Sequence, residues 1–261
     1  MRNRLSPKNG PSKVSAGISP HTPYTVSEKL LKKCAALARA EDIPLCIHLS
    51  ESPAETEFLC DGTGEILEFR REFGLPQRWK APRKTPVQYI RDISLLDKPA
   101  VLVHCNYVDE QDMDAIAASH SVVVFCPQSH QYFRHRLHPL ERMIEKGIPV
   151  ALGTDSLVSS PSLNVLEEMK AVLRTYGGVS PVDILKMATL NGLKALSFPY
   201  EPEFFHAGSS ARLTGIIVAP DELERARDPL EALFSESAEA VFSMVRGKII
   251  LHNGLASHYA N

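Results

Sequence analysis

The feature that most constrains the fold of this chain is an alternation of short apolar runs with longer helical stretches. Five runs are rich in aliphatic residues and hardly alternate with polar ones, which is typical of strands buried on both faces of a parallel sheet. These runs are residues 14–21, 44–50, 100–106, 121–127 and 149–155. Apolar residues at helical spacing occupy residues 27–40, 85–96, 109–119, 139–146 and 163–174. We therefore predict an α/β fold built of βα units around a parallel sheet.

The last part of the chain has a different pattern, which predicts a second and smaller unit. Residues 181–196 have the spacing of one more amphipathic helix, and residues 211–219 form another apolar run. Residues 241–254 have the pattern of a strand pair that turns at Arg246-Gly247. We expect a disordered or linker segment over residues 1–13, an α/β unit over residues 14–200 and a small β appendage over residues 201–261.

Charge and hydropathy narrow the classes to which the chain can belong. The net charge is -2, whereas nucleic-acid-binding proteins usually carry a basic face, so we expect no nucleic-acid partner. No run reaches the roughly 20 apolar residues that a transmembrane helix needs, and the basic, polar N-terminus lacks the apolar core of a secretory signal. We therefore expect a cytoplasmic protein without a membrane partner.

Residues able to bind a metal or to transfer a proton end three of the apolar runs. His48 ends the second run, His104 the third and Asp155 the fifth. A single histidine at such a place is more often a satisfied polar residue than a ligand. Active sites of βα barrels lie where the carboxyl ends of the strands meet. Three such residues together therefore favour a catalytic or metal-binding site.

A carboxylate lies close to the first of these histidines along the chain. Glu51 follows His48 by three residues, in the sequence H-L-S-E. By itself it would be typical of a loop or of the start of a helix, where the helix dipole favours a negative charge. Beside a candidate metal ligand, the same group can move a proton between a bound water and a leaving group.

Five segments together resemble one enzyme family. They are S-P-H-T-P-Y-T-V-S at 19–27, H-L-S-E-S at 48–52, V-H-C-N-Y at 103–107, F-C-P-Q-S-H at 125–130 and L-G-T-D-S at 152–156. Their order and spacing are similar to those of the cytosine/adenosine-type deaminases of the amidohydrolase superfamily. Within it, the chain looks most like the aminodeoxyfutalosine deaminase and S-adenosylhomocysteine/methylthioadenosine deaminase group. The resemblance implies a partial (β/α)8 TIM-type barrel, with about five of its eight βα units and a small C-terminal β appendage.

The resemblance also implies a hydrolytic deaminase of adenine-type purine nucleosides and gives several residues a role. His48 and Asp155 would bind one divalent ion, Zn²⁺ or Fe²⁺, and Asp155 would also accept a proton from the attacking water. Glu51 would protonate the purine ring and help to expel ammonia. His104 would orient the water or stabilise the oxyanion.

Three further residues would contact the nucleoside in the same scheme. His21 lies in the first of the five segments, Ser129 in the fourth and Ser156 in the fifth. The resemblance thus predicts a small-molecule purine nucleoside as the partner of this site.

Three histidines downstream of the fourth segment receive a plainer interpretation. They are His130, His135 and His138, and their spacings of five and three give no ligand geometry on a strand. We expect them on a substrate loop or on the surface.

One element of the family pattern is missing. The first barrel strand of the family ends in His-x-His, which supplies two metal ligands, and no two histidines of this chain stand two residues apart. Catalytic zinc usually has three protein ligands, whereas His48 and Asp155 supply two, or three if His104 turns inward. We expect a fragment of a longer protein. A pseudoenzyme and a barrel completed by a second chain are the alternatives.

An open sheet of five parallel strands would leave apolar faces and strand edges exposed. We therefore expect a homo-oligomer, or completion of the barrel by an N-terminal segment that this sequence lacks.

Other functions stay open at this point. A non-catalytic remnant or subunit would hold a nucleoside or a partner chain without releasing ammonia. Another amidohydrolase, such as a chlorohydrolase, would share the residues at the strand ends and release a different product. A flavodoxin-like sheet is the alternative fold, although the chain has no glycine-rich phosphate loop to favour it.

Overall fold

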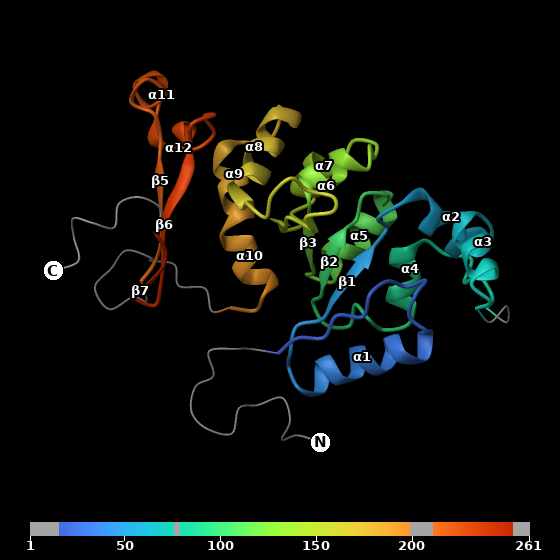
Figure 1. The fold of residues 1–261 in the computed structure, drawn as a ribbon. Helices are drawn as coiled ribbons and strands as arrows, with labels where there is room; N and C mark the ends of the chain where they lie inside the picture. Colours follow the sequence, from blue (N-terminus) through green and yellow to red (C-terminus); the bar gives the residue numbers. More distant parts are fainter. Residues whose placement is uncertain (1–15, 76–78, 199–210, 253–261) are drawn as a thin grey trace.

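The centre of the fold is a parallel sheet of four short strands. The computed structural model describes residues 16–75, 79–198 and 211–252, so the linker expected over residues 1–13 lies outside the described part. The strands pair in chain order as β1 (Cys46–Leu49), β2 (Val101–His104), β3 (Val122–Phe125) and β4 (Val150–Leu152). Four of the predicted runs are thereby confirmed as parallel strands, each a few residues shorter than predicted (Figure 1).

The first predicted strand, residues 14–21, is not a strand in the described residues. The segment runs beside β1 and makes one parallel bridge, between Ile18 and Leu45. Its backbone bonds are Ile18 N–H to the Pro44 carbonyl at 2.9 Å and Cys46 N–H to the Ile18 carbonyl at 2.8 Å. Pro20 follows soon after and has no N–H to give to a ladder, which explains why the pairing does not extend.

Helices precede β1, fill the connections between the four strands and follow β4. They are α1 (Glu28–Ala40), α2 (Pro53–Asp61), α3 (Glu65–Glu72), α4 (Pro86–Asp92), α5 (Glu110–Ala118), α6 (Pro127–Tyr132), α7 (Leu140–Glu145), α8 (Val165–Thr175), α9 (Pro181–Ala188) and α10 (Leu190–Ala195). Side-chain caps fix several starts: Ser27 accepts from Leu30 N–H, while Thr85 and Asp109 form capping boxes. The helices predicted between the strands are confirmed.

Three helical regions of the α/β unit differ from the sequence prediction. Residues 181–196 form α9 and α10 rather than one helix, with a break at Thr189 (φ -126°, ψ -83°). The Thr189 hydroxyl donates to the Leu185 carbonyl at 2.6 Å, a back-bond that competes with the helix. Helix α2 was not predicted, and neither was helix α6. The start of α6 is held from outside, because Glu168 accepts the Gln128 N–H at 2.9 Å.

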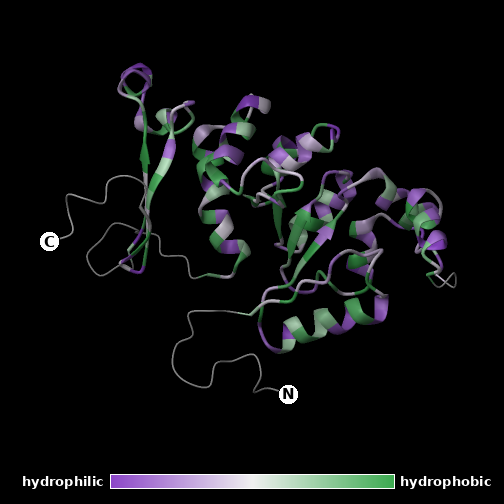
Figure 2. Ribbon diagram, viewed as in Figure 1, coloured by the Kyte–Doolittle hydropathy of each residue, from purple (hydrophilic) through white to green (hydrophobic). Residues whose placement is uncertain are grey.

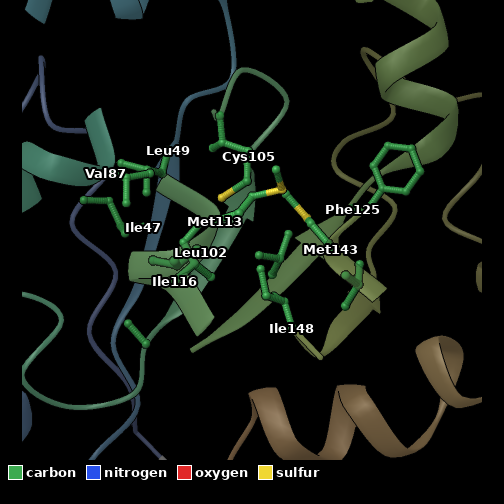
Figure 3. Packing of buried hydrophobic residues seen from close by; sticks show 14 of the residues in the cluster. Ile47, Leu49, Val87, Leu102, Cys105, Met113, Ile116, Phe125, Met143 and Ile148 are labelled. Carbon is green, nitrogen blue, oxygen red and sulfur yellow. The ribbon is translucent and has the colours of Figure 1, made fainter. Parts of the chain in front are cut away.

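One face of the sheet is buried under helices. Ile47, Leu102, Val123 and Val150 lie side by side in register, and each is at most 1% exposed. Figure 3 shows Ile47, Leu49 and Leu102 from the strands packed with Met113 and Ile116 from α5. Burial of such side chains contributes roughly 1.5–3 kcal/mol each. The central strands accordingly stand out as hydrophobic in Figure 2.

The other face of the sheet is apolar but less covered. Val122 and Ala151 pack with Ala195 of α10, and Val101 and Val124 are only partly buried against them. The sheet is open in the described part of the chain, where β1 and β4 are its outer strands and no closed barrel forms.

The outer edge of β4 is partly satisfied by a side chain. Asn191 of α10 donates from Nδ2 to the Val150 carbonyl at 2.7 Å. The bond occupies one of the backbone groups that an edge strand leaves free.

A separate antiparallel sheet follows near the C-terminus. It contains β5 (Arg212–Ile217), β6 (Glu239–Val245) and β7 (Lys248–His252), and α8 to α10 stand between it and the central sheet in Figure 1. The predicted turn is confirmed: Arg246 (φ 49°) and Gly247 (φ 74°) connect β6 to β7.

The connection between β5 and β6 contains two short helices that were not predicted, α11 (Pro220–Arg225) and α12 (Pro229–Ala232). The buried Lys170 of α8 donates from Nζ to the Ala238 carbonyl at 3.0 Å. This bond ties the segment before β6 to the α/β unit. Asn253-Gly254 lies outside the described residues.

Among the described residues, no helix combines the length and the hydropathy that a membrane crossing requires.

The close packing behind β4 gives a testable expectation. Gly153 follows β4, and a Cβ added there would lie 2.7 Å from Val124 Cγ1 and 3.1 Å from Cys126 Sγ. We expect Gly153→Ala to lower the free energy of unfolding by about 1–3 kcal/mol, as overpacking does. Gly192 of α10 is the control, because a Cβ there meets nothing within 4 Å. Gly192→Ala should be neutral or stabilising by about 1 kcal/mol. Urea unfolding measures both, and equal effects would contradict the packing described.

Candidate active site at the carboxyl ends of the parallel strands

The chain leaves each site-bearing strand through a residue in the left-handed backbone region. Ser50 after β1 has φ 51°, His104 and Cys105 at the end of β2 have φ 74° and 53°, and Asp155 after β4 has φ 56°. Such conformations cost a non-glycine residue roughly 1–3 kcal/mol and persist where the surroundings enforce them. At the ends of β1 and β2 two backbone bonds do so, from Cys105 N–H to the Leu49 carbonyl and from Tyr107 N–H to the Ser50 carbonyl, each at 2.9 Å.

Three histidines predicted for the site lie next to one another. The ring centroids of His48 and His104 are 5.4 Å apart, and those of His21 and His48 are 5.3 Å apart. His48 is half-buried, His104 is 4% exposed and His21 is exposed. The parallel pairing of β1 with β2 brings the first two together, because His48 pairs with Val103 and Leu49 with His104.

A backbone hydrogen bond sets the tautomer of His48. Its Nδ1–H donates to the His21 carbonyl at 3.2 Å. A carbonyl can only accept, so Nε2 of a neutral ring carries the lone pair. Metal-binding histidines commonly use this arrangement, in which one ring nitrogen donates to a carbonyl and the other binds the ion.

Glu51 and His104 form a close acid–base pair. Glu51 Oε1 lies 3.6 Å from His104 Nε2. Burial raises the pKa of the Glu51 carboxyl above its usual range. Burial, with a smaller contribution from His48, lowers the pKa of His104 to about 4. Both shifts favour the neutral forms, a protonated acid beside an unprotonated imidazole.

Asp155 is held by two serine hydroxyls. Ser159 Oγ donates to Asp155 Oδ2 at 2.6 Å, and Ser129 Oγ donates to the same oxygen at 2.7 Å. Partial burial disfavours the charged carboxylate, but these bonds outweigh it and lower the pKa of Asp155, with His104 and His48 adding to the effect. Asp155 is therefore an ionised proton acceptor near neutral pH.

Of the three residues expected to contact substrate, His21 and Ser156 are exposed and Ser129 is buried. The exposed His21 ring lies beside His48, with Nδ1 2.9 Å from Thr25 Oγ1. Ser129 is 1% exposed and directed at Asp155. Ser156 is exposed, and its hydroxyl accepts the Val158 N–H at 3.3 Å within its own loop. His21 thus joins the histidine cluster, whereas Ser129 supports Asp155.

His130 and His138 were expected on a substrate loop or on the surface, and the second of these alternatives is wrong. They are 8% and 2% exposed, and His138 donates from Nε2 to the His104 carbonyl at 2.9 Å. His130 donates from Nε2 to the Arg136 carbonyl at 2.8 Å. Both rings pack against Phe125. They fold residues 130–138 back over the end of β2, a long-range contact that spacing along the chain does not reveal.

Sequence reasoning also missed the polar residues behind the site. Asn106, 1% exposed, donates from Nδ2 to the Glu51 carbonyl at 3.0 Å. Glu55 and Glu168 are both 0% exposed and accept backbone N–H groups of Glu51 and Gln128, each at 2.9 Å. Asn106 stands in the V-H-C-N-Y segment and Glu55 four residues after Glu51. Their closeness along the chain to predicted site residues was the only sign of their role in the sequence.

The residues present supply only part of a metal site. Within the described ranges, no group of three or more histidine, cysteine, aspartate or glutamate side chains is placed to hold a metal ion. His48 offers a free Nε2 and Asp155 an ionised carboxylate, which are two of the three ligands that a catalytic zinc site usually has.

A cavity of about 460 Å³ lies beside the site. It is lined by Tyr24 and Thr25 on one side and by Ala54, Ile66 and Phe69 on the other, with further residues of 65–75. Thr25 is shared with the site through its contact to His21. None of the residues predicted for catalysis lines this cavity, so it neighbours the strand-end cluster without being part of it.

Comparison with known proteins decides the family. The model of the amidohydrolase family matches residues 4–248. The chain belongs to the amidohydrolase family. The family members include TIM-barrel proteins, and the parallel sheet described above fits that relationship.

The relatives of this amidohydrolase include deaminases. It is 28% identical over 250 residues to a 5-methylthioadenosine/S-adenosylhomocysteine deaminase of Thermoanaerobacter pseudethanolicus, covering 92% of this chain and 54% of that protein. It is 33% identical over 187 residues to the aminodeoxyfutalosine deaminase of Deinococcus radiodurans, covering 69% of this chain and 45% of that protein. The chain thus spans about half the length of the curated relatives it matches.

Solved structures show the same fold. The aminofutalosine deaminase of Helicobacter pylori in complex with methylthio-coformycin superposes with a TM-score of 0.78 at 23% identity, covering 93% of this chain and 59% of that one. An adenosine deaminase from Xanthomonas campestris with bound zinc gives a TM-score of 0.74 at 21% identity, covering 91% and 52%.

The buried His138 gives a pH-dependent expectation. Burial lowers the pKa of His138 to about 3 from its usual 6.5, so the unfolded chain binds this proton more tightly. Its stabilising effect is complete above pH 6.5 and is lost as the pH falls towards 3. We expect His138→Gln, which keeps a donor for the His104 carbonyl but cannot ionise, to flatten this acid dependence by up to about 1.4 kcal/mol per pH unit.

Urea unfolding between pH 4.5 and 7.5 measures the slope. His120→Gln is the control, since His120 is exposed and its replacement should leave the slope unchanged. Identical slopes for the parent protein and His138→Gln would contradict a neutral, buried ring.

Proposed function

We propose that this site carries out hydrolytic deamination of an adenine-type purine nucleoside. The observation that carries the proposal is the convergence of Glu51, His104 and Asp155 at one edge of the sheet, with a favoured protonation state for each. Glu51 and His104 favour their neutral forms and Asp155 its charged form. A proton donor, a neutral imidazole and a proton acceptor are the groups that this hydrolysis requires.

The reaction replaces the amino group of the purine with the oxygen of a water molecule. The water oxygen forms a bond to the ring carbon that bears the amino group, and Asp155 accepts a proton from the water. Glu51 gives its proton to the adjacent ring nitrogen, and His104 donates to the developing oxyanion or orients the water. The bond from carbon to the amino nitrogen then breaks, and the nitrogen takes the proton held by Asp155 and leaves as ammonia. The remaining proton on the carbon-bound oxygen passes to Glu51, which restores its acid form.

The substrate is assigned from the site and from the names of the relatives. His21 stands beside His48 with an exposed ring, a position from which it contacts a bound purine. Ser156 contacts the same ligand from the exposed loop after β4. Relatives named as deaminases of 5-methylthioadenosine, S-adenosylhomocysteine and 5'-deoxyadenosine support an adenine-type nucleoside.

His48 and Asp155 are our proposed ligands for one divalent ion, zinc or iron, whose chemistry would be to acidify a bound water. The described residues supply an incomplete ligand set for such an ion. The same observation favours a second candidate function, a non-catalytic chain that binds a nucleoside or a partner subunit.

A direct test combines metal analysis with an activity assay. We expect the purified chain to release ammonia from adenosine-type nucleosides, and Glu51→Gln to lower the rate by at least 10²-fold, the usual contribution of a general acid. Metal content by elemental analysis should not change. Glu57→Gln is the control, because Glu57 is exposed and bonds only to Thr63 among the described residues. No ammonia from the unaltered chain would overturn catalysis by this chain and leave the binding function.

The less covered face of the sheet supports a further proposal, self-association. Val101, Val103 and Val124 are only partly buried on that face, and apolar patches of this kind usually mark interfaces. We expect light scattering on purified protein to give at least twice the mass of one chain. A single species with the mass of one chain would contradict this proposal.

A further inference from the structure

The carboxyl of Glu55 lies directly behind the loop that carries Glu51, and the reaction proposed above does not use it. The side chain is 0% exposed. Its Oε2 accepts the backbone N–H of Glu51 at 2.9 Å, and the amide of Ser50 faces the same carboxyl. Its Oε1 has no hydrogen-bond partner among the described residues. A buried oxygen without a partner costs free energy.

The local sequence explains how Glu55 arrives there and how it departs from a common motif. Ser52-Pro53-Ala54-Glu55 has the pattern of a capping box at the start of α2. The first half is present, since Ser52 Oγ accepts the Glu55 N–H at 3.3 Å. In the usual motif the glutamate returns to the N–H of the cap residue. Here it accepts from the residue before the cap, so it joins the helix to the site loop.

Both backbone polar groups of Glu51 are hydrogen-bonded to buried side chains. Glu55 holds its N–H, and Asn106, 1% exposed, holds its carbonyl from Nδ2 at 3.0 Å. Only the Glu51 side chain is left to face His104 Nε2, 3.6 Å away. A catalytic carboxyl must be held within a fraction of an ångström to act efficiently, and these two buried contacts fix the atoms from which it extends.

We propose that Glu55 is a positioning residue, which clamps the backbone of Glu51 and thereby fixes the proton-donating carboxyl against His104. The consequence for catalysis rests on the proposed function, whereas the clamp itself does not.

The electrostatics agree with this geometry. Burial raises the pKa of Glu55 to about 8 from its usual 4.5, so the carboxyl is neutral near pH 7. A neutral acceptor can hold the Glu51 amide without placing a second negative charge beside the Glu51 carboxyl. A glutamine at this position retains such an acceptor, and a leucine fills similar space without one.

The test compares Glu55→Gln with Glu55→Leu, and Ser52→Ala is the matched control. Ser52→Ala removes the cap of the same helix and leaves the Glu51 N–H bond in place. Amide hydrogen exchange, resolved at Glu51 by NMR, reports the clamp directly. We expect Glu55→Leu to speed exchange at Glu51 at least tenfold, and Glu55→Gln and Ser52→Ala to keep it within twofold of the parent.

Two outcomes would overturn the proposal. Unchanged exchange at Glu51 in Glu55→Leu would show that the carboxyl holds nothing there. Equal loosening in Ser52→Ala would show that Glu55 acts only as a helix cap. Should Glu55→Leu fail to fold, Glu55→Met carries the same comparison with an unbranched side chain.

The pH dependence of unfolding gives a second readout. The folded protein keeps the Glu55 proton up to about pH 8, while the unfolded chain releases it near 4.5. Stability of the parent should therefore fall relative to Glu55→Gln as the pH rises through this interval, and level off above it. Equal slopes would contradict a buried neutral carboxyl.

A kinetic readout separates this proposal from the proposed function. In an active preparation, Glu55→Leu should lower kcat for ammonia release at least tenfold with KM within twofold, and Glu55→Gln should restore it. Unchanged kcat in Glu55→Leu would overturn the positioning role. Absence of ammonia from the parent protein would defeat the proposed function, and the exchange result at Glu51 would still decide the clamp.

Discussion

The parallel register of the central strands is the constraint on which the site depends. Neighbouring parallel strands end at the same edge, so residues more than fifty positions apart along the chain become neighbours there. Leu49 pairs with His104, and Glu51, just beyond β1, consequently reaches to 3.6 Å from His104. The left-handed turns at Ser50, His104 and Asp155 then redirect the chain at this edge. Their strain is tolerable because the strands below are locked into a helix-covered core.

A layer of buried polar side chains stands between that core and the site. Asn106, Glu55, Glu168 and His138 are each at most 2% exposed, and each bonds to a backbone group near a strand end. Burying polar groups costs free energy unless they are paired, so their concentration at this edge indicates a demand for precise placement. The same low polarity shifts the pKa of acids upwards and of bases downwards, which favours the neutral forms of Glu51 and His104.

In the described part of the chain, both the metal site and the cover of one sheet face are incomplete, and the two lie close together. The ligand set around His48 and Asp155 falls short of three, and the face of the sheet that carries His48 has half-buried valines rather than a full cover. Additional protein surface against that face would cover the valines and lie next to the incomplete ligand set.

The sequence by itself determined the element types and the identity of the strand-end residues. Unbroken aliphatic runs such as V-L-V-H and V-V-V-F predict parallel strands, because strands buried on both faces need no polar alternation. The hairpin at Arg246-Gly247 could be predicted because a tight turn needs residues that accept a positive φ. Helix α6 and the break at Thr189 could not be predicted from helical spacing. The start of α6 depends on a contact with Glu168, and the break coincides with a local hydrogen bond from the Thr189 hydroxyl.

Only the tertiary structure decided how the candidate site is held. That His130 and His138 are buried, that Ser129 supports Asp155 and that Glu55 grips Glu51 all depend on side chains meeting across separate elements or around a turn. Periodicity reports which face of an element is apolar, but it carries no information on which polar atoms meet. Those pairings arise when the strands align, because the free energy of a buried hydrogen bond depends on distances that the folded chain alone defines.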